Sequence, residues 1–314
     1  MRIVDAHCHL APEELSDDAL VAAMDRDGIE RAVVMAKTMP YCPPIPQGKF
    51  KAIPYVLRGP LAPWGRRSYE NNLREGRIRV GSQWVEVLRE PDNEEVAAAV
   101  RRHPTRLAGL VFLNPASGGD PMTVLRHYVE QEGFVGVKLH AWWHNVDLAL
   151  ELTEVAEYCQ SRGLPILVHL GSRPQTSNVE GLLRSFPNLV VILAHGGIPH
   201  FDRFWPLIRK FDTLFTDLSG DYVKPKLTRQ IVRKVGVSKA IWGTDAPYTL
   251  RQSASKEHYD HSFRQEIEKA MALPISDSEK ERIFSGNILR ILRLDDKYAG
   301  SSGGDQGAQG AREG

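Results

Sequence analysis

The chain has 314 residues, of which 42% are hydrophobic and 25% charged, values that are typical of soluble globular proteins. Lys and Arg number 40 against 39 Asp and Glu, so no net field favours nucleic acid or an anionic membrane. We therefore expect a small-molecule substrate and neither a nucleic-acid nor a membrane partner. The three cysteines show no Cys-x-x-Cys spacing, and no apolar run approaches the roughly 18 residues of a membrane span, which favours a cytoplasmic protein.

Short apolar segments alternate with longer amphipathic ones, a pattern that is typical of repeated βα units and a parallel sheet. Their β-branched residues favour strands that are buried on both faces. Between them, Asp147–Arg162 has helical spacing of its apolar residues. We predict an α/β fold in which residues 1–298 form one (β/α)₈ or TIM barrel. The predicted strands are Arg2–His7, Arg31–Ala36, Leu107–Leu113, Gly136–His140, Ile166–His169, Val190–His195, Leu214–Leu218 and Ala240–Thr244.

Two segments depart from this repeat. A long excursion from about Met39 to Pro91 follows the second strand and is rich in Pro, Arg and aromatic residues. Because structureless loops of this length are uncommon unless they are functional, we interpret it as a lid or pocket wall with short elements of its own. Residues 299–314 are mainly Gly, Ser and Gln with a few charges, which predicts a disordered tail.

Histidine and aspartate side chains gather at the predicted carboxyl ends of the strands. His7 and His9 lie two residues apart and therefore project from the same face, where two imidazoles can share one ion. His169, His195 and Asp245 each end an apolar strand, on the face where such barrels place their active sites. This mixture of ligands suits Zn²⁺, or alternatively Mn²⁺ or Fe²⁺. The alternative is a set of hydrogen-bonded polar residues that fill one end of the barrel.

Five segments together resemble the amidohydrolase-related family, which includes aminocarboxymuconate-semialdehyde decarboxylase and many metal-dependent hydrolases. The similarity spans roughly residues 1 to 294. It implies that His7, His9, His169 and Asp245 are the metal ligands and that His195 is the catalytic histidine. The segments are Asp-Ala-His7-Cys-His9, Ile-Leu-Val-His169, Ile-Leu-Ala-His195-Gly-Gly, Trp-Gly-Thr-Asp245-Ala-Pro-Tyr and Gly286-Asn287-Ile-Leu-Arg-Ile-Leu.

The fourth predicted strand departs from the decarboxylase pattern, because Lys138 and His140 share one of its faces. In binuclear relatives a lysine on this strand is carboxylated and bridges two metals. A carboxylated Lys138 together with His169 and His195 could hold a second ion, whereas an uncarboxylated lysine could pair with Asp245 or bind an anionic substrate. His140 is a further candidate for contact with the second ion or the substrate. We favour one ion over two. Trp142, Arg173 and Tyr248 are predicted to contact the substrate.

The expected reaction is hydrolysis of an amide, lactone or ester of a small, anionic substrate by a metal-activated water. Asp245 would accept the proton, and His195 or the metal would stabilise charge on the attacked carbonyl oxygen. The alternatives are non-oxidative decarboxylation of an unsaturated or aromatic acid, and a barrel that binds metal without catalysis. A homodimer is one oligomeric state that we keep as a hypothesis. Candidate clamps for a substrate carboxylate are Arg58, Arg66, Arg67, Arg173 and Arg251.

Overall fold

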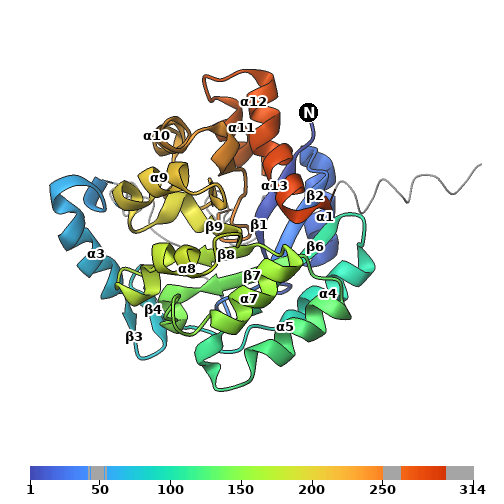
Figure 1. The fold of residues 1–314 in the computed structure, drawn as a ribbon. Coiled ribbons are helices and arrows are strands. Elements are labelled where there is room, and N and C mark those ends of the chain that lie inside the picture. Colours follow the sequence, from blue (N-terminus) through green and yellow to red (C-terminus); the bar gives the residue numbers. More distant parts are fainter. Residues whose placement is uncertain (42, 44–52, 54, 250–262, 295–314) are drawn as a thin grey trace, which may run out of the picture.

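The computed structural model describes residues 1–41, 43, 53, 55–249 and 263–294. Its centre is an eight-stranded sheet of consecutive, parallel neighbours (Figure 1). The amide of Asp245 donates to the carbonyl of His7 over 2.7 Å, which joins the last strand segment to the first and closes a TIM barrel. The strands are β1 (Val4–Leu10), β2 (Arg31–Ala36), β6 (Leu107–Leu113), β7 (Gly136–His140), β8 (Ile166–His169), β9 (Val191–Leu193), β10 (Leu214–Asp217) and β11 (Ala240–Ile241).

Helices follow the strands and cover the outside of the barrel (Figure 1). The first of them, α1 (Asp17–Asp27), begins where the Ser16 side chain accepts from the amide of Ala19 and ends before Gly28, whose φ of 76° suits glycine. The helices that follow later strands are α4 (Asn93–Arg102), α5 (Pro121–Glu130), α6 (Ala141–His144), α7 (Thr153–Arg162), α8 (Val179–Ser185), α9 (Phe201–Lys210), α10 (Pro225–Val235), α11 (Arg264–Met271), α12 (Asp277–Glu281) and α13 (Asn287–Leu292). None of the described helices has the length and apolar character needed to cross a bilayer.

Both faces of the barrel strands are buried, as the near-continuous apolar runs predict. On β2, Val33 and Met35 belong to the cluster inside the barrel, whereas Val34 packs against the surrounding helices. This alternation follows from the two-residue period of a strand. Ile288 and Leu292 of α13 join the inner cluster, so the last described helix contributes to the same core.

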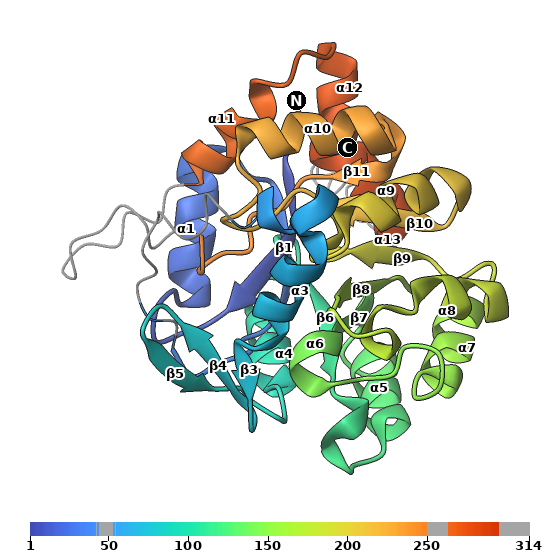
Figure 2. The same ribbon diagram turned by 90° about the vertical axis from the view of Figure 1, so that its left-hand side faces the viewer.

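The excursion after β2 has elements of its own, as the sequence predicts. It contains the 3₁₀ turn η1 (Gly59–Leu61), helix α3 (Ala62–Glu70) and an antiparallel sheet of β3 (Leu73–Arg74), β4 (Arg77–Val80) and β5 (Gln83–Glu86). Ile78, Val80 and Val85 of this sheet pack with Met39 and Trp142. Figures 1 and 2 together show that α3 lies over one end of the barrel.

Several predicted bounds are wrong in detail. The first strand runs from Val4 to Leu10 rather than from Arg2, and the sixth ends at Leu193, so His195 lies beyond its strand. The predicted helix from Asp147 begins only at Thr153, because the Asp147 carboxylate accepts from the amides of Ala149 and Leu150 and holds a turn there. The proposed tail lies outside the described residues.

Candidate active site

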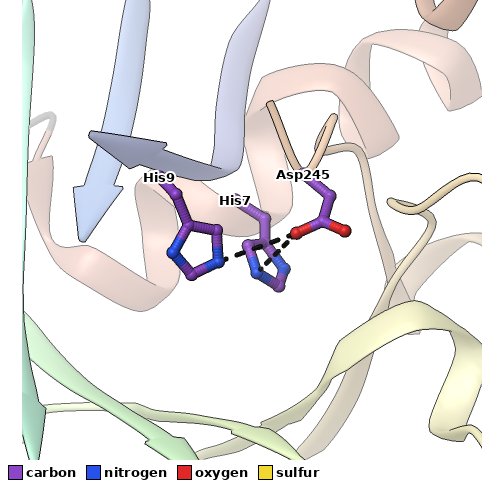
Figure 3. A group of neighbouring side chains, drawn as sticks. All are labelled: His7, His9 and Asp245. Atoms are coloured by element: carbon purple, nitrogen blue, oxygen red, sulfur yellow. Dashed lines mark ion pairs between the residues drawn. The ribbon is translucent and has the colours of Figure 1, made fainter. Parts of the chain in front are cut away.

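Three predicted metal ligands converge at the carboxyl ends of the first and last strands. The Oδ1 atom of Asp245 lies 3.5 Å from Nε2 of His7 and 3.6 Å from Nε2 of His9. Figure 3 shows both imidazoles turned toward this carboxylate. Among the described residues, His7, His9 and Asp245 form a group whose ligand atoms all lie within 4.8 Å of one another.

The backbone around Asp245 is held by its neighbours. Its own amide donates to the carbonyl of His7, and Asp5 accepts from the hydroxyl of Thr244 over 2.6 Å and from the amide of Thr244 over 3.0 Å. Asp245 has a φ of 65°, in the left-handed region that non-glycine residues rarely adopt. These contacts fix a strained residue at the strand end, which is typical of functional sites.

Both imidazoles of the first strand are oriented by a bond at their other nitrogen. Nδ1 of His7 donates to Oδ2 of Asp217 over 2.8 Å, and Nδ1 of His9 donates to the carbonyl of Ala36 over 2.7 Å. Burial lowers the pKa of His7 well below its usual value and that of His9 to about 3. The rings are therefore neutral and present the lone pair of Nε2 toward Asp245, the state that a metal ligand requires.

The donor set fits a divalent metal ion. If two ligands bind one tetrahedral zinc at about 2.0–2.2 Å each, they lie roughly 3.3–3.6 Å apart. The separations of 3.5 and 3.6 Å between Asp245 and the two histidines match this value. Two neutral imidazoles and one carboxylate are also the ligand types that zinc, manganese and iron share.

Asp217 and Ser219 extend this site, and the sequence analysis did not identify either residue. Oδ1 of Asp217 accepts from the backbone amide of His195 over 2.7 Å and from the hydroxyl of Ser219 over 2.7 Å. The Ser219 hydroxyl also lies 2.8 Å from Nδ1 of His195. Asp217 ends an apolar strand, which is the same signal that identified His195 and Asp245, so it could have been found.

His195 lies in the 3₁₀ turn η4 (Ala194–Gly197) with a φ of 57°. Its Nε2 is 3.9 Å from Oδ2 of Asp245, and its ring stacks on that of His7 with centroids 5.0 Å apart. Burial lowers the pKa of His195 well below its usual value, so the ring is neutral. His195 also belongs, with His7 and Asp217, to a second group of described residues whose potential ligand atoms all lie within 4.8 Å of one another.

Lys138 projects into the same site from β7. Its Nζ lies 3.1 Å from Nε2 of His7, and burial lowers its pKa to about 8. The ammonium thus supplies positive charge next to the imidazole and carboxylate acceptors. His140, two residues further along β7, stacks on His169 with ring centroids 4.2 Å apart, because the two residues pair in register across β7 and β8.

His169 is the predicted ligand that the structure places apart from the others. Its Nε2 lies 2.7 Å from the hydroxyl of Tyr69, which comes from α3 of the excursion. Among the described residues, His169 belongs to no group of three or more potential ligands whose atoms all lie within 4.8 Å, although its ring centroid is 4.9 Å from that of His195. Tyr69 carried no signal in the sequence, because nothing along the chain shows where the excursion folds back onto the barrel.

A cavity of about 210 Å³ opens above these residues. Its walls are largely apolar and aromatic, and Arg79 of β4 is the arginine among the described lining residues. Arg173, predicted to bind substrate, lies outside this lining, and its Nε pairs with Glu70 over 2.7 Å. Predicted site residues that do line the cavity are His9, Lys138, His140, Trp142, His169, His195, Asp245 and Tyr248.

A family model described as Amidohydrolase matches residues 4–294. The chain belongs to the amidohydrolase family. This confirms the resemblance inferred from the strand-end histidines and makes the protein a metal-dependent enzyme of the amidohydrolase superfamily. A sequence comparison of this amidohydrolase with curated proteins gave no match.

Solved structures share the barrel of this amidohydrolase at low sequence identity. A dihydroxybenzoic acid decarboxylase from Polaromonas sp. JS666, with bound manganese, is 14% identical with a TM-score of 0.59, over 94% of this chain and 97% of that one. A 4-oxalomesaconate hydratase from Rhodopseudomonas palustris is 18% identical with a TM-score of 0.60, over 96% and 99%. A protein from Acinetobacter baumannii described as a probable 2-pyrone-4,6-dicarboxylic acid hydrolase is 14% identical with a TM-score of 0.58, over 93% and 100%.

Proposed function

We propose that this amidohydrolase hydrolyses an amide, lactone or ester of a small substrate, with Asp245 as the proton acceptor. The observation that carries the proposal is the position of the Asp245 carboxylate, with Oδ1 beside His7 and His9 and Oδ2 3.9 Å from His195. Oδ1 of Asp245 can thus bind the metal ion, while Oδ2, on the side of His195, can accept the proton. A bound divalent ion supplies Lewis acidity and lowers the pKa of a coordinated water to about 7.

The other residues of the site are assigned to metal binding and to the stabilisation of charge. His7, His9, His169 and Asp245 are the proposed ligands of one Zn²⁺, with Mn²⁺ and Fe²⁺ as alternatives. Because the Ser219 hydroxyl donates to Asp217, Nδ1 of the neutral His195 donates to Ser219, and its Nε2 presents a lone pair that can accept a hydrogen bond. Developing negative charge on the substrate would then be stabilised by the metal ion. The apolar walls exclude water from the body of the substrate and strengthen these polar contacts.

We favour one ion over two. Nζ of Lys138 lies 3.1 Å from Nε2 of His7, so the lysine amine lies beside a proposed ligand. A second ion would require carboxylation of that amine. We also propose that the substrate is anionic. Arg79, which lines the cavity, is better placed than Arg173 to bind its carboxylate.

Decarboxylation of an aromatic or unsaturated acid is the second candidate. Trp142, Trp143, Tyr222 and Tyr248 line the cavity and offer flat surfaces to a planar substrate. Structural relatives include decarboxylases as well as hydrolytic enzymes, so the fold favours neither reaction.

The test combines metal content with a substrate panel. Metal per chain is measured by mass spectrometry after loading with Zn²⁺ or Mn²⁺, with and without bicarbonate. One equivalent in both conditions supports the mononuclear site, and a second equivalent only with bicarbonate indicates a carboxylated Lys138. Each loaded form is then assayed on lactones, amides and esters against aromatic and unsaturated acids. Turnover of the first group supports the hydrolase, whereas release of carbon dioxide from the second group supports the decarboxylase.

A further inference from the structure

Helix α3 of the excursion reaches into the site through one hydroxyl group. Tyr69, in its last turn, lies 2.7 Å from Nε2 of His169, and its ring stacks on Trp142 with centroids 3.9 Å apart. Figure 2 shows α3 in front of one end of the barrel, and His169 is the last residue of β8. A residue about 100 positions away in the chain therefore contacts a proposed ligand.

The contact is supported by the next residue of the helix. Glu70 accepts a hydrogen bond from the hydroxyl of Ser172 and pairs with Arg173 over 2.7 Å. Both partners follow directly after β8, so the carboxyl end of α3 is attached to the loop behind His169 at several points. This also explains why Arg173 is engaged outside the cavity.

His169 differs from His9 in which nitrogen is occupied. His9 uses Nδ1 for the carbonyl of Ala36 and leaves Nε2 directed toward Asp245, whereas His7 uses Nδ1 for Asp217 and has its Nε2 3.1 Å from Nζ of Lys138. In His169 the Nε2 atom itself is bonded to Tyr69. Whichever tautomer is present, this atom either accepts from the hydroxyl through its lone pair or carries a proton, and in neither state can it bind a metal.

We propose that Tyr69 and the metal ion compete for Nε2 of His169, so that α3 holds this ligand away from the metal until the ion displaces the tyrosine. The inference rests on the proposed function, because it takes His169 as a metal ligand. Tyr69 is thus a positioning residue for the metal site, supplied by the excursion rather than by the barrel.

The competition predicts a definite change in metal affinity. A typical intramolecular hydrogen bond changes an equilibrium constant by a factor of roughly two to ten. Tyr69→Phe removes this bond while keeping the ring that stacks on Trp142. Metal binding then no longer has to break the bond, so the dissociation constant for Zn²⁺ should fall by about two- to tenfold.

The experiment measures Zn²⁺ affinity by competition with a chromophoric chelator, in protein first stripped of metal. Tyr158→Phe is the matched control, because it also removes one hydroxyl hydrogen bond from a buried ring, here to Glu130, away from the site. We expect tighter binding in Tyr69→Phe and unchanged binding in the control. Unchanged or weaker binding in Tyr69→Phe would overturn the competition.

A double-mutant cycle with His169→Ala separates this inference from the proposed function. If the two groups compete, Tyr69→Phe should have no effect on Zn²⁺ affinity when His169 is absent. An equal effect in both backgrounds would show that Tyr69 acts elsewhere and refute the inference. If His169→Ala alone keeps wild-type affinity, the proposed ligand set is wrong. If it weakens binding while Tyr69→Phe changes nothing, the ligand set stands and only the competition fails.

Discussion

In the proposed mechanism Asp245 would combine two roles, metal ligand and proton acceptor, that are often divided between residues. Its oxygens face three neutral imidazoles, those of His7, His9 and His195. Burial raises the pKa of Asp245 well above its usual value, while the nearby charge of Lys138 opposes this rise. A carboxylate with an elevated proton affinity in such surroundings is suited to accept a proton as well as to bind an ion.

Asp245→Asn tests the proton-accepting role. The amide keeps the shape of the side chain and one oxygen, but it cannot accept a proton at neutral pH. We expect the variant to fold and to retain part of its metal, while kcat falls by a factor of about 10²–10⁴. Steady-state kinetics and metal analysis on the same sample check this. Wild-type turnover with full metal would move the proton acceptor to His195 or His140.

Asp217 holds two residues of the proposed metal site without being a proposed ligand itself. Its two oxygens hold the Nδ1 atom of His7 and the backbone amide of His195. In Asp217→Asn one accepting oxygen becomes an NH₂ group, which cannot accept the hydrogen bond from His7 or from the amide of His195. Loss of such a partner typically lowers metal affinity about 10–100-fold. Chelator competition measures the change. Asp212→Asn, at an exposed position just before β10, is the control and should bind metal as the wild type does.

At the scale of elements, the docking of α3 depends on a close backbone contact. A Cβ atom added at Gly65 would lie 2.0 Å from the carbonyl oxygen of Val56. Alanine normally stabilises a helix by up to about 1 kcal/mol relative to glycine, but forcing backbone apart in a packed region costs about 1–3 kcal/mol. The steric cost is the larger of the two, so α3 and the backbone at Val56 must separate.

Gly65→Ala should therefore loosen α3 while the barrel remains folded. Hydrogen exchange of peptides from residues 62–70 should be faster than in the wild type, with little change in peptides from the barrel strands. Gly119→Ala is the control, because the nearest atom to its new Cβ would be 3.9 Å away. Protection of α3 equal to the wild type would show that the neighbouring segment gives way at no cost.

At the scale of the whole molecule, the barrel depends on joining its first strand to its last. Asp5 on β1 accepts hydrogen bonds from the hydroxyl and the amide of Thr244. The Thr244 hydroxyl oxygen in turn accepts from the amide of Ala246. Burial raises the pKa of Asp5 to about 7, and the hydrogen bonds from Thr244 partly offset the cost of burying this carboxylate. Closure and the site are therefore built from the same few residues.

Thr244→Val should weaken this closure, because a buried carboxyl oxygen loses its donor. We expect the free energy of unfolding to fall by about 1–3 kcal/mol. Urea denaturation of the metal-free protein measures this without a contribution from metal binding. Thr213→Val removes one hydroxyl bond, to the carbonyl of Pro187, at a less buried position just before β10. A loss of stability no larger than in that control would contradict the role assigned to Thr244.

The order of strands and the barrel could be predicted from the sequence alone, as could the grouping of His7, His9 and Asp245 at one end of the barrel. Strands such as Arg31–Ala36 and Gly136–His140 match the structure because strands buried on both faces form continuous apolar runs with polar residues at their ends. The same regularity identified His7, His9 and Asp245. Asp217 carried this signal as well, although it was not recognised.

The contacts of the excursion were decided by tertiary structure. Tyr69, Glu70 and Arg79 carry no periodic signal, because the excursion does not belong to the repeating βα pattern. The position of Tyr69 at His169 and the pairing of Glu70 with Arg173 depend on how α3 packs across the barrel end. Local sequence predicts local elements and shared faces, whereas contacts between residues about 100 positions apart arise only when the chain closes on itself.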